Sequence, residues 1–286
     1  MSIKVTDLSY SYDSGKTFAV KGVSNVIESK EFLAIIGHTG SGKSTFIQNL
    51  NALLLPTLGS VTVDEYVIKN KVKIKNIKEL RKKIGIVFQF PEYQLFEETV
   101  EKDILFGPRN FKLISKDNQD ENKLAKEVLE IVGLDESFLK KSPFELSGGE
   151  KRRVAIAGIL AFNPDVLIVD EPTAGLDPNA TANMMDLFKK LNDMGKTIIL
   201  VTHQMDHVLK YADRALVFQN GELKCDKTPI ELFNDLNLIK SLGIDVPSVI
   251  NLTHTLSKKY PKLLDYKIKT IDDFIKAYKE VIALWL

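Results

Sequence analysis

Short apolar runs, separated by polar residues, recur along the chain. They lie at residues 32–36, 84–88, 166–169, 197–201 and 216–218. Continuous runs rich in β-branched residues are typical of strands buried on both faces of a parallel sheet. Helical spacing of apolar residues separates most of these runs, as at residues 118–132, where Gly133 is expected to end the helix. The pattern predicts an α/β fold.

Alternation of apolar and polar residues near the N-terminus predicts an antiparallel β layer beside the parallel strands. Residues 3–26 indicate short strands with a turn at residues 13–15, and residues 61–68 indicate another strand. The pair Asn220 and Gly221 predicts a hairpin turn, so the central sheet is expected to be mixed.

The sequence changes character after residues 228–229. Short helical stretches are then broken at Pro247 and Pro261, and an amphipathic stretch covers residues 271–285. We expect a large domain over residues 1–225, with a helical subdomain at about residues 92–160, and a small C-terminal helical domain over residues 226–286.

The composition of the chain excludes several classes of protein. The chain has 286 residues, with 39 basic and 38 acidic side chains and a net charge of +1, so no overall field favours nucleic acid. Cys225 is the only cysteine, which excludes an intrachain disulfide and fits a reducing cytosol. The N-terminus has no apolar signal core and no run of 18 apolar residues occurs, so we expect no membrane span.

A basic run at residues 69–83 contains eight Lys or Arg side chains and one acid, Glu79. Such a run can bind a membrane or a nucleic acid. Residues 71–75 alternate lysine with apolar residues, as in an edge strand whose solvent-facing lysines discourage pairing with another sheet. We favour the edge strand over a binding site.

A phosphate-binding loop follows the apolar run at residues 32–36. It matches the P-loop pattern GxxxxGK[ST] and consists of Gly37, His38, Thr39, Gly40, Ser41, Gly42, Lys43 and Ser44, followed by Thr45. The glycines let backbone N–H groups face phosphate oxygens, and the helix that begins here directs its positive end at the same anion. Lys43 is expected to reach the β- and γ-phosphates, and Ser44 to hold Mg²⁺.

Two carboxylates end the apolar run at residues 166–169. Asp170 is expected to hold Mg²⁺ through water, and Glu171 to orient or deprotonate the water that attacks the γ-phosphate. Exposed acids also end buried strands for ordinary solubility. An adjacent pair downstream of a P-loop favours the catalytic interpretation.

A second helix start that can bind an anion lies at residues 146–150, with the sequence LSGGE. Together with the P-loop, the carboxylate pair and the later His203, this segment resembles the ATP-binding cassette (ABC) ATPases over about residues 3–225. In that family, the signature motif of one subunit closes over the ATP that the other subunit holds. The phosphate-facing positions match at Ser147, Gly148 and Gly149, whereas Glu150 stands where the family commonly has glutamine.

The resemblance implies roles for further residues. Gln89 matches the Q-loop glutamine, which contacts Mg²⁺ or water and links the site to a membrane partner, and Asp177 matches the D-loop at the dimer seam. His203, 32 residues after the second carboxylate, matches the switch histidine that touches the γ-phosphate. Tyr12 matches the aromatic residue that stacks on adenine, although Tyr10 could stack instead or pack into the core.

Within this family, residues 80–96, 98–104 and 152–158 resemble the ATPase subunits of energy-coupling factor transporters, and the FPEYQLFEETV segment is similar to the second of their two paralogous ATPases. The resemblance implies an ATP-hydrolysing subunit, with ATP and Mg²⁺ as cofactors, that powers uptake of vitamins or other micronutrients. It implies a peripheral position on the cytoplasmic face of the cell membrane. The implied partners are a second ATPase, either a paralogue or a second copy, a transmembrane coupling protein and a substrate-binding membrane protein, with no nucleic acid.

Three aromatic residues and a leucine lie in the segment after Gln89, at residues 90–96. Surface loops seldom carry so many large apolar side chains unless they cover a core or meet a partner. We expect Tyr93, Leu95 and Phe96 to form a groove for a helix of the membrane coupling protein. A satellite cluster that covers the core is the alternative.

Three other functions fit parts of the pattern. An ATPase of another ABC transporter shares all the motifs. A non-transport ATPase that acts on DNA would insert long coiled-coil heptads, but only 57 residues separate Gln89 from Ser147. A P-loop kinase of small metabolites needs neither the signature motif nor His203, and it would leave phosphate on an acceptor rather than free.

Overall fold

A six-stranded mixed sheet lies at the centre of the chain, which the computed structural model describes over residues 1–72, 74–113 and 118–283. Its strands are β3 (Phe32–Ile36), β6 (Ile84–Val87), β7 (Val166–Asp170), β8 (Thr197–Val201), β9 (Arg214–Gln219) and β10 (Glu222–Lys227). The order is β10-β9-β3-β8-β7-β6. All neighbours are parallel except β10, which pairs antiparallel with β9 across the predicted turn at Asn220 and Gly221.

The predicted antiparallel layer is a four-stranded sheet. It consists of β1 (Ile3–Tyr10), β2 (Val20–Ile27), β4 (Leu58–Val63) and β5 (Tyr66–Lys69), in the order β2-β1-β4-β5. The single strand predicted at residues 61–68 is wrong, because a turn at Asp64 and Glu65 divides it into β4 and β5. Asp64 has a positive φ of 47°, a conformation that short polar residues adopt more readily than other non-glycine residues.

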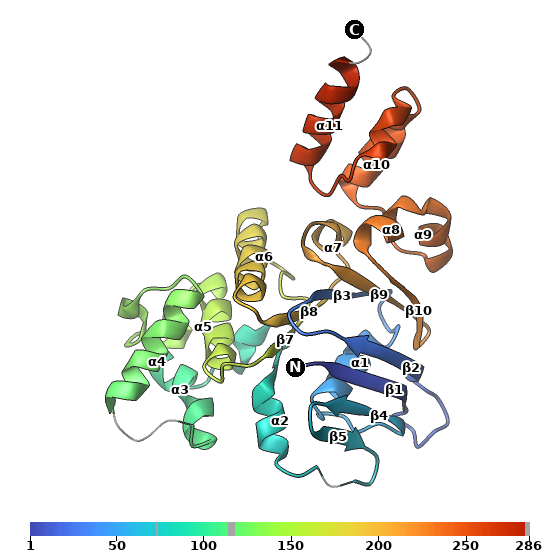
Figure 1. Cartoon of the computed structure of the whole chain (residues 1–286). Coiled ribbons are helices and arrows are strands. Elements are labelled where there is room, and N and C mark those ends of the chain that lie inside the picture. Colours follow the sequence, from blue (N-terminus) through green and yellow to red (C-terminus); the bar gives the residue numbers. More distant parts are fainter. Residues whose placement is uncertain (73, 114–117, 284–286) are drawn as a thin grey trace.

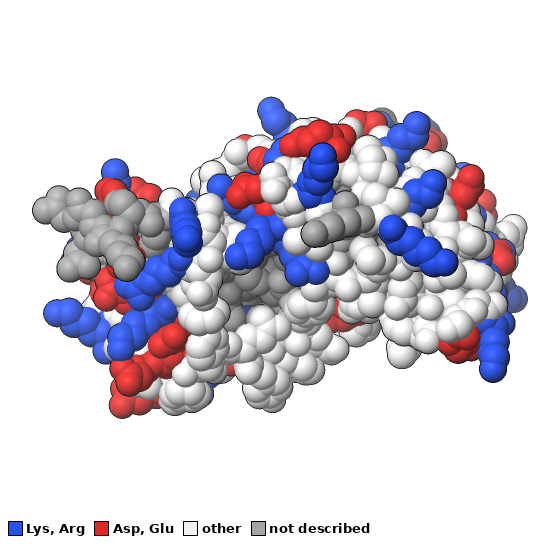
Figure 2. Space-filling view, turned by 90° about the horizontal axis from the view of Figure 1, so that it is seen from below, with Lys and Arg blue, Asp and Glu red and all other residues white. Residues whose placement is uncertain are grey.

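The edge strand predicted at residues 71–75 is also wrong. The strand β5 ends at Lys69, and the described neighbours Lys71, Val72 and Ile74 lie in turn and loop, while residue 73 lies outside the described residues. Seen from below, this side of the molecule carries Lys and Arg side chains interspersed with Asp, Glu and uncharged ones (Figure 2). The face drawn in Figure 2 is therefore not continuously basic.

Helices cover the sheets and form two outlying groups (Figure 1). They are α1 (Lys43–Leu50), α2 (Ile77–Lys83), α3 (Val100–Asn110), α4 (Asn118–Ile131), α5 (Gly148–Leu160), α6 (Pro178–Asp193), α7 (Met205–Tyr211), α8 (Pro229–Asn234), α9 (Leu236–Leu242), α10 (Ser248–Ser257) and α11 (Ile271–Ala283). Helices α3, α4 and α5 gather on one side of the central sheet, and α8 to α11 extend beyond α7 (Figure 1). As predicted, α4 stops before Gly133, whose φ is +74°.

Two apolar clusters hold the layers together. One lies between the two sheets around α1 and includes Leu33 and Ile35 of β3, and the other includes Phe32, Ala34 and Ile36 on the opposite face of that strand. Burial on both faces fixes β3, and therefore fixes the point at which the chain enters the P-loop. In the described part of the chain, no helix is both long and apolar enough to span a bilayer.

Candidate active site

Three loops meet at the carboxyl ends of β3, β8 and β7, which are consecutive strands in the sheet. The P-loop follows β3, the carboxylate pair ends β7, and His203 follows β8. Register brings them together, because Val201 of β8 lies beside Ile35 of β3 on one side and Asp170 of β7 on the other. Ligands of open α/β sheets bind at such an edge.

The P-loop wraps around its own lysine. Lys43 Nζ donates to the carbonyl oxygens of Gly37, at 2.6 Å, and His38, at 2.8 Å, and lies 3.4 Å from Ser41 Oγ. Burial lowers the pKa of Lys43, while the two carboxylates after β7 oppose that shift. A phosphate group offers this nitrogen charged acceptors, which form stronger hydrogen bonds than the carbonyls do.

Two glycines allow the loop to close tightly. Gly37 has a φ of +142° and Gly42 a φ of +100°, and a Cβ would lie 2.1 Å from Phe218 O at the first position and 2.3 Å from Ala19 O at the second. Only glycine fits such backbone contacts. The loop can therefore direct backbone N–H groups at an anion without interference from side chains.

The two predicted protein ligands of Mg²⁺ are adjacent. Ser44 Oγ donates to Asp170 Oδ2 at 3.1 Å. Burial raises the pKa of Asp170 and the neighbouring Glu171 adds to the shift, whereas the hydrogen bond from Ser44 opposes it. A hydroxyl and a carboxylate that leave room for phosphate oxygens and water fit Mg²⁺. The predicted third ligand, Gln89, is exposed, and like Ser44 and Asp170 it is not among the residues that line the cavity beside the P-loop.

The predicted catalytic pair is in contact. His203 Nδ1 lies 2.8 Å from Glu171 Oε1. Glu171 has a φ of +48°, a left-handed conformation that costs a non-glycine residue roughly 1–2 kcal/mol. Strain of this kind persists where the surrounding structure enforces it, which is often at functional sites. The imidazole thus occupies one of the two carboxylate oxygens of Glu171.

A cavity of about 260 Å³ lies beside these groups. It is lined by Gly37, His38, Thr39, Lys43, Glu171, His203, Met205, Gly243, Ile244 and Asp245. The last three come from the loop between α9 and α10, and sequence analysis did not predict them as part of the site. No motif marks that loop, so only the tertiary fold reveals its position.

Two aromatic residues flank the P-loop helix. The side chain of Tyr12 is 66% exposed, and its hydroxyl lies 3.0 Å from Thr45 Oγ1 in α1. Tyr10 packs against the core and meets the Tyr12 ring edge-on at 4.8 Å. Of the two candidates for stacking on adenine, Tyr12 alone presents a largely open ring.

The signature segment forms the start of α5. Ser147 and Glu150 make a capping box, in which Glu150 Oε2 accepts hydrogen bonds from Ser147 N, at 2.8 Å, and Ser147 Oγ, at 2.7 Å. These hydrogen bonds lower the pKa of Glu150. A glutamine supplies the same acceptor oxygen, so Glu150 preserves this local structure. The D-loop residue Asp177 likewise caps a helix, since its Oδ1 accepts from Asn179 N and Ala180 N at 2.9 Å each.

Comparison with known proteins agrees with this geometry. Residues 20–174 match the ABC transporter family model. The energy-coupling factor transporter ATP-binding protein EcfA2 of Spiroplasma kunkelii is 48% identical over 284 residues, which cover 96% of this chain and 91% of that protein. The structure of cbiO1 from Clostridium perfringens, part of the ABC transporter complex cbiONQ, has 37% identity and a TM-score of 0.74, and the match covers 88% of this chain and 98% of that one.

A dimeric structure of the ATP-binding cassette MJ0796, bound to ADP and Pi after hydrolysis, has 32% identity and a TM-score of 0.71, and the match covers 79% of this chain and 98% of that chain. Fold, P-loop and signature segment define an ABC ATPase. The chain belongs to this family and, within it, to the ATP-binding, ATP-hydrolysing proteins of energy-coupling factor importers. The predicted resemblance to the second paralogous ATPase is confirmed, because several relatives carry the name EcfA2.

Proposed function

We propose that this protein hydrolyses ATP at the cavity beside the P-loop and that the energy powers uptake of vitamins or other micronutrients through membrane partners. The convergence of Lys43, the Ser44–Asp170 pair and the Glu171–His203 pair carries the proposal. We assign residues 1–225 to the nucleotide-binding domain, with its helical subdomain at about residues 92–160, and residues 226–286 to a C-terminal helical domain. The central sheet itself ends slightly later, with β10 at Lys227.

Each group has a role in this proposal. The P-loop amides and Lys43 hold the phosphates, and Tyr12 stacks on the adenine. Mg²⁺, held by Ser44, Asp170 and Gln89, would neutralise charge on the phosphate oxygens. His203 leaves Glu171 to contact the γ-phosphate, which frees the carboxylate to orient the attacking water.

We further propose that a second ATPase, either another copy or a paralogue, supplies the signature segment. Gly148 and Gly149 support this, because a Cβ at either would meet no atom within 4 Å in the described chain and neither has a positive φ. Packing within this chain therefore does not require glycine there. Close approach of a nucleotide held by a facing subunit would require it, with Ser147 beside the γ-phosphate and Asp177 at the seam.

The membrane partners are assigned to an apolar groove of about 300 Å³ between the segment after Gln89 and helices α3 and α5. Phe96 and Phe106 line it, are partly exposed, and meet edge-to-face at 4.8 Å. Leu95 also lines the groove but packs against the core, so the core-covering alternative describes this residue. Tyr93 is 84% exposed and is not among the lining residues.

We propose that a helix of a transmembrane coupling protein fills this groove, with a substrate-binding membrane protein in the same assembly. The ATPase then lies peripherally on the cytoplasmic face of the membrane. The similar protein cbiO1 is part of an ABC transporter complex, which supports such an assembly.

The test is co-purification of the tagged chain from a membrane extract. The double variant Phe96→Ser/Phe106→Ser should lose the membrane proteins while keeping its melting temperature and ATP affinity, since both rings are partly exposed. Met194→Ser, which removes an exposed apolar side chain at the end of α6, is the matched control and should retain them. Normal recovery of membrane partners by the groove variant would contradict the groove assignment, and recovery of no membrane protein by the unmodified chain would contradict the proposed assembly.

A further inference from the structure

The loop between α9 and α10, residues 243–247, lies beside the P-loop and the loop that carries His203. We refer to it as the connecting segment. Gly243, Ile244 and Asp245 line the cavity together with Lys43 and His203. The C-terminal helical part of this chain is thus a wall of its own ATP site, although none of the family's motifs includes it.

One end of the connecting segment rests on the P-loop. Gly243 ends α9 with a φ of +63°, and a Cβ there would lie 2.7 Å from His38 Nε2. The imidazole of His38 therefore packs directly against the backbone of Gly243. The carbonyl of His38 also accepts a hydrogen bond from Lys43 Nζ. An exchange of this carbonyl for phosphate oxygens would therefore alter the contacts of a residue that touches Gly243.

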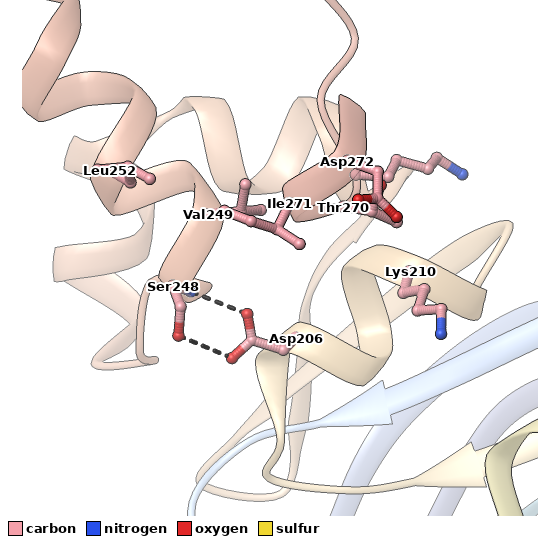
Figure 3. A pocket seen from close by; sticks show the side chains of 9 residues that line it. Asp206, Lys210, Ser248, Val249, Leu252, Thr270, Ile271 and Asp272 are labelled. Atoms are coloured by element: carbon pink, nitrogen blue, oxygen red, sulfur yellow. Dashed lines mark hydrogen bonds between the residues drawn. The ribbon is translucent and has the colours of Figure 1, made fainter. Parts of the chain in front are cut away.

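The other end is bound to the helix that follows the switch histidine (Figure 3). Asp206, three residues after His203 and in the first turn of α7, accepts hydrogen bonds from Ser248 N, at 2.9 Å, and Ser248 Oγ, at 3.1 Å. Ser248 is the first residue of α10, whose preceding Pro247 provides no side-chain cap. Asp206 thus caps α10 from outside, where a negative charge is favourable.

A cavity lies beside this hydrogen-bonded pair, although α7 and α10 both contribute buried residues to the same apolar cluster. Its volume is about 430 Å³, with Lys210 of α7 on one side and Val249 and Ile271 on the other (Figure 3). Continuous packing is therefore interrupted here. The two hydrogen bonds join the start of α7, which follows the switch-histidine loop, to the start of α10, which follows the connecting segment.

We propose that the connecting segment positions His203, with Asp206 and Ser248 as the positioning residues. Asp206 fixes the start of α7, Ser248 joins it to the connecting segment, and Gly243 holds that segment on the P-loop. His203 then leaves Glu171 along a path that ends at the γ-phosphate, and occupancy of the P-loop changes the connecting segment. The inference rests on the proposed roles of the ATP site and adds a function for the C-terminal helical part.

The test uses the full-length chain under conditions in which the unmodified protein, with its partner ATPase, hydrolyses ATP. Asp206→Ala should lower kcat roughly ten- to a hundred-fold, the scale expected when a reacting group is displaced by about 1 Å, with KM for ATP nearly unchanged. Asp206→Asn should restore kcat, because its amide can accept from Ser248 N and donate to Ser248 Oγ. Asp235→Ala, which removes the cap that Leu238 N uses in α9, is the control and should leave kcat unchanged.

Two measurements separate positioning from a merely structural role. In a His203→Ala background, Asp206→Ala should cause no further loss of kcat, because the carboxylate acts through that histidine. In Glu171→Gln, addition of ATP should slow hydrogen exchange at residues 243–247. Equal losses of kcat with and without His203, or unchanged exchange on ATP binding, would overturn the inference. Absence of hydrolysis by the unmodified, assembled protein would instead overturn the proposed function.

Discussion

The side chains of Glu171 and His203 are in direct contact. The distance of 2.8 Å between Glu171 Oε1 and His203 Nδ1 leaves no room for a water molecule between these atoms. Replacing the carboxylate with an amide keeps its size and its neighbours but removes the base. We expect Glu171→Gln to reduce phosphate release by about 10²- to 10⁴-fold, the usual contribution of general-base catalysis, and to leave ATP affinity intact.

The matched comparison for this variant is Lys43→Ala, which removes a phosphate-binding group and should weaken ATP binding itself. Equilibrium binding of ATP and the rate of phosphate release are measured for both proteins. Unimpaired turnover in Glu171→Gln would show that another group activates the water.

Asp170 illustrates a conflict between binding and stability at a single residue. Burial raises its pKa, so the charged form is less favourable in the folded chain than in the unfolded one. The stability that this group contributes is complete below its unfolded pKa of about 3.9 and is lost as the pH rises through the higher folded value. At neutral pH, Asp170 therefore destabilises the nucleotide-free protein.

We accordingly expect Asp170→Asn to raise the urea midpoint at pH 7 in the absence of Mg²⁺ and nucleotide, and to abolish Mg²⁺-dependent hydrolysis. The increase should shrink as the pH is lowered through the folded pKa, since both proteins are then neutral at this position. A lower midpoint at pH 7 would show that the carboxylate's hydrogen bond with Ser44 outweighs its burial.

Individual residues differed in how far the sequence could predict them. Lys43 and Asp170 were predictable because a P-loop and a strand-end carboxylate create their sites from local sequence. The capping role of Glu150 was not predicted, although a serine followed three residues later by glutamate is the pattern of a capping box. Gly243 carried no local signal, because its contact with His38 depends on the tertiary fold alone.

At the scale of elements, Arg152 joins the helix of the signature segment to the segments that follow the Q-loop and precede the D-loop. Its side chain in α5 is only 3% exposed and forms a bidentate pair with Glu92, at 2.7 and 3.0 Å, in the turn after the Q-loop. It also donates to the carbonyls of Pro172 and Ala174, just before the D-loop. Burial raises the pKa of Glu92, but the hydrogen bond and charge of Arg152 outweigh it, and the pKa lies below its usual value.

Removing one partner of this pair should be costly. Arg152→Met leaves the Glu92 carboxylate without its cation, and we expect a loss of roughly 3–5 kcal/mol in the free energy of unfolding. Adding Glu92→Leu should recover part of the loss. Arg109→Met is the comparison, because Arg109 forms a similar bidentate pair with Glu121 but is itself 43% exposed, so water can replace it beside the carboxylate and we expect a smaller loss.

Urea unfolding of the single and double variants gives their free energies of unfolding, which complete the double-mutant cycle for Arg152 and Glu92. Equal losses for Arg152→Met and Arg109→Met would contradict the argument from burial. A double variant that is no more stable than Arg152→Met alone would show that the carbonyls of Pro172 and Ala174, rather than Glu92, account for the loss.

The elements themselves were predictable where burial alone determined them. The continuous apolar runs became β3, β6, β7, β8 and β9 because both faces of those strands are covered. The prediction failed at residues 61–68, where no glycine or proline marks the turn after β4, and at residues 71–75, where the described lysines Lys71 and Lys75 are exposed and lie in turns. Amphipathic alternation on its own cannot separate a strand from an exposed loop.

At the scale of the whole molecule, each chain provides a P-loop on one surface and a signature segment on another. The cavity beside the P-loop is lined by residues that do not include Ser147 or Gly148. The start of α5 is open, since a Cβ at Gly148 meets nothing nearby. A single chain therefore provides two half-sites, and catalysis is expected to depend on a second ATPase.

If that second ATPase is another copy of this chain, two inactive variants should restore activity when mixed. Lys43→Ala disables the P-loop and retains its signature segment. Gly148→Asp retains the P-loop but places a negative charge where the facing phosphate should lie, while the same charge stabilises the start of α5. The mixed dimer then contains one site with an intact P-loop and an intact facing signature.

Random pairing of equal amounts of the two variants makes half of the dimers mixed, and one of the two sites in each mixed dimer is intact. We therefore expect about a quarter of the unmodified activity from the mixture. Neither variant should be active alone. Phosphate release from the mixture and from each variant is measured, with dilution to the monomer as a second check. Lack of restoration, combined with activity that appears when a paralogous ATPase is added, would assign the facing signature to the paralogue. Constant specific activity in a demonstrably monomeric sample would contradict the shared site altogether.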